Sequence, residues 1–105
     1  MLSKRQKPPN RRKTETHTLE TTTGRYHVSF GYGSKDRLRE VFIRGSKSGS
    51  EMDLLLDDAS VVLSLALQHG VPPDQLLHSL VNGREEGARS TLAKAIALMQ
   101  EKENG

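Results

Sequence analysis

The chain has 105 residues, of which 33% are hydrophobic, and a formal net charge of +3 at pH 7. This length predicts one small domain, and the hydrophobic fraction, below the roughly 45–50% of typical soluble domains, predicts a modest core. The absence of cysteine excludes disulfides, thiolate metal sites and dithiol chemistry on this chain. The histidines lack metal-ligand spacing, and no apolar run reaches the ~20 residues that cross a bilayer. We therefore expect no metal, no cofactor, no membrane contact and a cytoplasmic location.

Charge is distributed unevenly along the chain. Residues 1–50 contain 12 Lys and Arg against 4 Asp and Glu, a net charge of +8, whereas residues 51–105 contain 4 against 9, a net charge of −5. Such an asymmetry can steer anionic partners towards one end of the molecule or favour association between copies.

Residues 1–13 are predicted to form a disordered basic tail ahead of a single domain at 14–105, because almost nothing in them can be buried. Two interpretations remain open for this tail. It is either a solvated extension or a contact for nucleic-acid phosphates. The cations that would make such contacts are Lys4, Arg5, Lys7, Arg11, Arg12 and Lys13.

The next segment predicts a three-stranded antiparallel meander over about 15–44. Residues 14–23 are rich in threonine and suit an edge strand with one wet face. Residues 25–32 alternate between apolar and more polar side chains, which is typical of a half-buried strand. Tyr26, Val28, Phe30 and Tyr32 lie on one face. Residues 38–44 contain β-branched and aromatic side chains and predict the third strand.

Three helices are predicted after the strands, at about 51–69, 73–81 and 91–102, packed on one face of the sheet in an α+β fold. The first has apolar residues around much of its circumference, so we expect it to be buried on more than one side. Its surplus apolar surface predicts a homodimer that buries part of Leu54, Val61 or Leu65.

The loop between the third strand and the first helix is rich in glycine and serine. A strand-to-helix loop exposes unpaired amides at the positive end of a helix dipole, which suits an anion such as a nucleotide phosphate. The candidate residues are Arg44, Ser46, Lys47, Ser48, Gly49 and Ser50. The alternative, which we favour, is structural: the glycines permit the turn and a serine caps the helix, whose first turn already carries Glu51 and Asp53.

The same stretch carries a family resemblance. Glu40-Val-Phe-Ile43, the loop Gly45-Ser-Lys-Ser-Gly-Ser50, and a leucine-rich helix closing on Leu67-Gln-His-Gly70 before Val71-Pro-Pro resemble the TSCPD domain. The resemblance implies an α+β fold and a link to adenosylcobalamin-dependent ribonucleotide reductases and DNA synthesis. That family takes its name from a Thr-Ser-Cys-Pro-Asp segment, and this chain has no cysteine. Thiol delivery is therefore excluded here, and the resemblance supplies no catalytic residue.

Two functions follow as expectations. The first is a non-catalytic accessory or binding module that docks to a ribonucleotide reductase or binds a nucleotide-like anion at the loop. The second is a nucleic-acid-binding protein that uses the basic tail together with cations on the sheet, namely Arg25, Lys35, Arg37, Arg39 and Arg44. An independent enzyme is not expected, because no nucleophile–base pair or carboxylate pair stands out.

Overall fold

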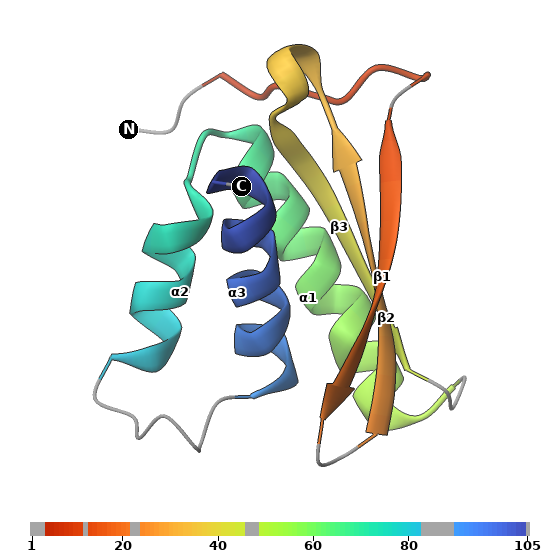
Figure 1. Ribbon diagram of the computed structural model, residues 1–105. Helices are drawn as coiled ribbons and strands as arrows, with labels where there is room; N and C mark the ends of the chain where they lie inside the picture. Colours follow the sequence, from red (N-terminus) through yellow and green to blue (C-terminus); the bar gives the residue numbers. More distant parts are fainter. Residues whose placement is uncertain (1–3, 12, 22–23, 46–48, 83–89, 105) are drawn as a thin grey trace.

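The fold is one antiparallel sheet with three helices on one side of it (Figure 1). The computed structural model describes residues 4–11, 13–21, 24–45, 49–82 and 90–104. The sheet has the order β1-β2-β3, in which β1 and β3 are the edges. The elements are β1 (Thr14–Thr21), β2 (Gly24–Tyr32), a 3-10 turn (Ser34–Asp36), β3 (Leu38–Gly45), α1 (Glu51–Gln68), α2 (Pro73–Val81) and α3 (Thr91–Asn104).

The core lies between the inner face of the sheet and the helices. The alternation predicted for the second strand is confirmed, because Tyr26, Val28, Phe30 and Tyr32 are all buried. The α3 helix supplies the facing layer, where Ala95, Ile96 and Met99 are fully buried. Leucines of α2 and α3 pack around this cluster and complete the apolar layer.

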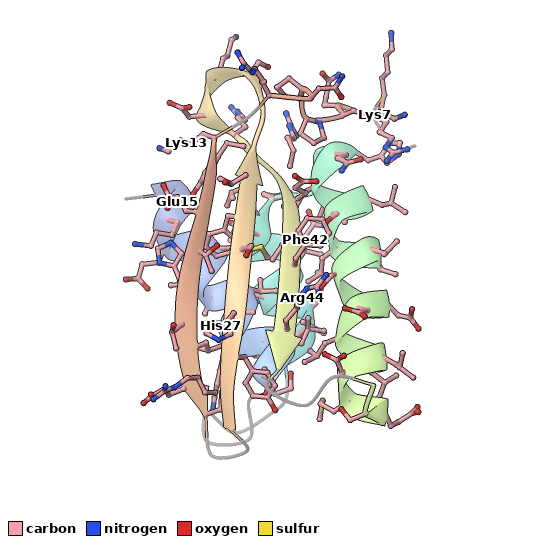
Figure 2. All side chains as sticks on the ribbon, turned by 90° about the vertical axis from the view of Figure 1, so that its right-hand side faces the viewer. Lys7, Lys13, Glu15, His27, Phe42 and Arg44 are labelled. Atoms are coloured by element: carbon pink, nitrogen blue, oxygen red, sulfur yellow. The ribbon has the colours of Figure 1, made fainter. Side chains whose placement is uncertain are left out.

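The helix α1 runs beside β3 (Figure 2). Both its start and its end lie close to the residues that the sequence predicts. Ser50 caps its first turn by accepting a hydrogen bond from the Asp53 amide at 3.1 Å. Gly70 follows its end with a φ of 89°, the left-handed conformation expected of a C-terminal glycine. The α+β class, the meander and the three helices are thus confirmed, with boundaries shifted by one or two residues.

Residues 4–11 form an extended segment that crosses one end of the sheet and the C-terminal end of α1 (Figure 1). The Gln6 amide donates to the Gln68 carbonyl at 2.6 Å, and Arg5 Nε donates to Gln68 Oε1 at 2.6 Å. At the other end of the segment, the Tyr32 amide donates to the Lys13 carbonyl at 3.1 Å. Whether the independently folding domain begins at Thr14 remains a prediction.

Candidate docking surface

One side of α1 presents a line of large apolar side chains to solvent. Val61 and Val62 are 58% and 65% exposed, and Leu54 and Leu55 are 53% and 55% exposed. Met52 near the start of the helix and Leu65 near its end are also exposed, at 47% and 38%. Scattered exposed apolar residues are ordinary on protein surfaces, but several large ones on one side of a single helix make a candidate interaction site, here with the exposed Asp58 between its two ends.

Phe42 extends the surface onto the sheet. It lies on the outer face of β3, the face opposite the core, and 46% of it is exposed. Figure 2 shows Phe42 and Arg44 on this outer face, on the strand that runs beside α1. We call Phe42 and the exposed apolar residues of α1 the docking surface, whose members are Phe42, Met52, Leu54, Leu55, Val61, Val62 and Leu65.

Hydrogen bonds between side chains of α1 and the backbone of β3 set the orientation of the helix. The amides of Val41 and Ile43 lie on the free edge of β3, and they donate to Ser64 Oγ at 2.9 Å and Ser60 Oγ at 3.0 Å. Gln68 Nε2 continues the row by donating to the Arg39 carbonyl at 3.0 Å. Spacing of four residues places the three polar side chains on one line of the helix.

Because these polar residues face the strand edge, the apolar residues of α1 are divided between two directions. Leu56, Leu63 and Leu67 turn inward and are buried. The residues on the opposite side of the helix, including Leu54, Val61 and Leu65, are left in solvent. The line formed by Ser60, Ser64 and Gln68 is therefore buried against the edge of β3.

The glycine-serine loop is only partly within the described residues. Ser46, Lys47 and Ser48 lie outside them, and Arg44 is exposed on the outer face of β3. Asp53 Oδ2 accepts a hydrogen bond from the Gly49 amide at 3.2 Å, while Ser50 Oγ accepts from the Asp53 amide. These two hydrogen bonds cap the start of α1 and place the Asp53 carboxylate at the Gly49 amide. Anion binding by the loop stays a prediction.

The basic residues proposed for the sheet have different surroundings. Arg39 Nη1 donates to the Leu67 carbonyl at 2.7 Å and helps to close the C-terminal turn of α1. Arg25 pairs with Glu20 at 2.7 Å on the exposed β1–β2 end. Lys35 lies in the turn before β3 with a φ of 60°, and Arg37 is exposed beside it. The structure therefore distributes these cations over several surfaces and does not gather them on one face.

A small cluster of one carboxylate, one histidine and one lysine occurs at the start of β1. His17 Nε2 lies 3.2 Å from Glu15 Oε1, and Lys13 Nζ lies 3.4 Å from Glu15 Oε2. The hydrogen bond with His17, followed by the contact with Lys13, holds the pKa of Glu15 below its ordinary value of 4.5. The His17 ring also lies against Phe30, with centroids 5.4 Å apart. Across the described residues, no group of three or more His, Asp and Glu side chains has an arrangement that could hold a metal ion.

The fold is that of a small α+β module with several large apolar residues exposed on α1 and β3. Comparison with known proteins identifies the module: residues 3–101 match the TSCPD domain, and the chain belongs to that family. It is 32% identical over 90 residues to a vitamin B12-dependent ribonucleotide reductase of Bradyrhizobium diazoefficiens, a match that covers 84% of this chain. It is 27% identical over 95 residues to the enzyme of the same name from Rhodopirellula baltica, covering 90% of this chain.

The chain spans less than a tenth of the relatives that it matches, 7% of the first and 9% of the second. A vitamin B12-dependent ribonucleotide reductase of Streptomyces coelicolor is 39% identical over 56 residues, which cover 53% of this chain. No solved structure matches the chain. Within the described part of the chain, no helix is both long enough and apolar enough to cross a membrane.

Sequence reasoning found the apolar surplus of α1 but missed Phe42 and the partners of the β3 edge. The spacing of Ser60, Ser64 and Gln68 could have indicated these contacts. Polar residues four apart lie on one line of a helix, and such a line in an otherwise apolar helix indicates hydrogen bonds to a neighbouring element. Phe42 carried no such signal, since an aromatic residue suits either face of a strand.

Proposed function

We propose that this chain is a non-catalytic accessory module that docks on a ribonucleotide reductase through the docking surface of α1 and Phe42. The observation that carries the proposal is the row of large apolar residues on α1, of which Val62 is 65% exposed. The exposed Asp57 of the same helix and Arg44 on β3 would supply polar contacts at the rim of this surface, and Asp58, which lies between Leu54 and Val62 on the helix, would need a polar or cationic group on the partner.

Family membership supports the choice of partner. The relatives carry a matching segment within a much larger reductase chain. A segment of that kind has the rest of its own polypeptide as a neighbour, and an apolar face is the ordinary means by which such units pack together. This chain would use the same kind of surface to bind a reductase, which would link it to DNA synthesis.

The test is binding of this chain to a vitamin B12-dependent ribonucleotide reductase from which the matching segment has been deleted. Calorimetry should show binding by the wild-type chain and a loss of at least tenfold for Val61→Glu and Val62→Glu, because each places a charge in an apolar contact. Thr18→Glu is the matched control, since it adds the same charge at an exposed strand position away from α1.

The proposal fails if the wild-type chain does not bind the deleted enzyme. It fails equally if Val61→Glu and Thr18→Glu bind alike, because the partner would then contact another surface. Circular dichroism of each variant separates a lost contact from a lost fold.

The second candidate is nucleic-acid binding through the basic tail. Lys4, Lys7 and Arg11 are exposed, and within the described ranges none of them pairs with a carboxylate. If this candidate holds, the logarithm of affinity for DNA should fall linearly with the logarithm of salt concentration, by about 0.9 per phosphate contacted. Deletion of residues 1–13 should abolish that slope.

A further inference from the structure

A hollow of about 400 Å³ lies where the N-terminal segment passes the β2–β3 turn. Its lining comes from both segments: Lys7, Pro9, Arg11, Lys13, Tyr32, Gly33, Ser34 and Asp36. This volume falls within the ~300–1,000 Å³ range of small-molecule sites. Figure 2 shows Lys7 and Lys13 at the same end of the sheet, away from the docking surface around Phe42.

The lining of the hollow has a net positive charge. It contains three cations, Lys7, Arg11 and Lys13, against the single carboxylate of Asp36. Neither Lys7 nor Arg11 forms an ion pair with any carboxylate that the structure describes. Lys13 also contacts Glu15, at 3.4 Å, which lies outside the hollow. Cations gathered in a concave surface without matching carboxylates attract anions more strongly than the same cations spread over a flat one.

Backbone hydrogen bonds hold the segment that carries these cations against the domain before any anion binds. Gln6 is bonded to the end of α1 and Lys13 to Tyr32 of β2, so both ends of the intervening segment are fixed to the domain. Pro8 and Pro9 restrict the backbone between these two points. Binding an anion here therefore costs less ordering of the chain than binding to a free tail would.

The lining indicates which part of a ligand would be recognised. Tyr32 is only 7% exposed, and its ring is already covered by Lys13 Nζ at 5.2 Å from the centroid. A base therefore has no free aromatic face on which to stack, which is the usual means of holding single-stranded nucleic acid. The hydroxyl of Ser34 and the three cations instead suit phosphate oxygens.

We propose that this hollow binds a compact oligophosphate anion, such as the phosphate chain of a nucleoside di- or triphosphate. The site is separate from the docking surface and from the glycine-serine loop. It differs from the nucleic-acid hypothesis for the tail because it requires the tail fixed against the domain and recognises a short anion.

The experiment is an NMR titration of the full chain with inorganic tripolyphosphate, a nucleoside triphosphate and the parent nucleoside. Tripolyphosphate and the nucleoside triphosphate should both shift the amide resonances of Gly33 and Ser34 at millimolar concentration, and the nucleoside should not. Lys7→Ala and Arg11→Ala should each weaken binding roughly fivefold to tenfold, as expected for loss of one charge-assisted contact. Lys4→Ala is the matched control and should bind normally, because Lys4 is in the same segment but does not line the hollow.

Several results would overturn the proposal. Absence of shifts at Gly33 and Ser34 with about 10 mM tripolyphosphate would exclude useful affinity. Equal losses for Lys4→Ala and Lys7→Ala would show unspecific attraction to the tail. Shifts confined to residues 45–50 that vanish in Lys47→Ala would place the anion at the glycine-serine loop. Tight, steeply salt-dependent binding of single-stranded DNA without binding of tripolyphosphate would favour the nucleic-acid candidate.

Discussion

At the scale of single residues, two serines on α1 determine how the helix meets the sheet. Ser64 Oγ accepts from the Val41 amide at 2.9 Å and lies 3.2 Å from the Val41 carbonyl, to which it donates. Ser60 Oγ donates to the Leu56 carbonyl at 2.7 Å while accepting from the Ile43 amide. Each hydroxyl therefore acts as both donor and acceptor in a buried place, where an unpaired amide would be costly.

We predict that Ser64→Ala lowers the free energy of unfolding by about 1–3 kcal/mol, the usual cost of leaving a buried donor unpaired. Urea denaturation measures the change. Ser79→Ala is the control, because Ser79 makes its hydrogen bond to Gln75 on an exposed face of α2 and should change stability by no more than about 0.5 kcal/mol. Equal effects of the two substitutions would show that the β3 edge does not depend on Ser64.

The second prediction at this scale concerns Glu15. Its pKa is lowered in the folded chain by the hydrogen bond with His17 and by Lys13, so the ionised carboxylate contributes stability at neutral pH. That contribution is present above the ordinary value of 4.5 and is lost as the pH falls through the lower folded value. The difference in melting temperature between the wild type and Glu15→Gln should therefore shrink as the pH falls below 4.5. A carboxyl titration midpoint at or above 4.5 by NMR would contradict this expectation.

At the scale of elements, α1 contacts two different surroundings, the polar edge of β3 and the apolar core. It must supply polar partners along the edge of β3 and apolar side chains to the core, and it can do both only by leaving its remaining apolar residues outside. An uncovered strand edge invites pairing with another chain, so the helix also protects β3 from such contacts. The exposed apolar row is the physical consequence of that arrangement.

This arrangement predicts self-association when no other partner covers α1. We expect the chain alone to form a homodimer that buries Leu54, Val61 or Leu65, because an exposed apolar row gains free energy when a second copy removes it from water. Analytical ultracentrifugation should show a concentration-dependent dimer for the wild type and for Thr18→Glu, and a monomer for Val61→Glu. A wild-type chain that stays monomeric at several hundred micromolar would contradict the prediction.

At the scale of the whole molecule, folding places the basic N-terminal segment against the C-terminal end of α1. The basic N-terminal segment lies across the end of α1, where Arg5 and Gln6 both bond to Gln68. Its residues are nevertheless almost all exposed, with Pro8 alone partly buried among residues 4–11. The segment thus adds contacts and charge to one end of the domain while contributing little apolar burial.

We predict that a chain beginning at Thr14 folds and melts within about 5 °C of the full chain, since loss of ~1 kcal/mol shifts the melting temperature of a domain this size by only ~4–8 °C. Differential scanning calorimetry of the two chains provides the comparison. A decrease of more than about 15 °C would show that the segment belongs to the cooperative unit. The same truncated chain should lose oligophosphate binding if the hollow beside the β2–β3 turn is the site.

The sequence by itself determined the element order and the family of this protein. Strict alternation at Tyr26 to Tyr32 specifies a buried strand face, and Ser50 and Gly70 specify the ends of α1 through local capping, which depends on a few neighbouring residues. Only the tertiary structure decided which side of α1 faces solvent. Helical periodicity defines the relative positions of Leu56, Ser60 and Val61, but it does not say which of them meets a strand edge. The hydrogen bonds from the Val41 and Ile43 amides set which side of α1 faces β3. These amides are distant in sequence from the serines and become their neighbours only when the sheet has formed. For the same reason, the hollow between the N-terminal segment and the β2–β3 turn exists only in the folded chain.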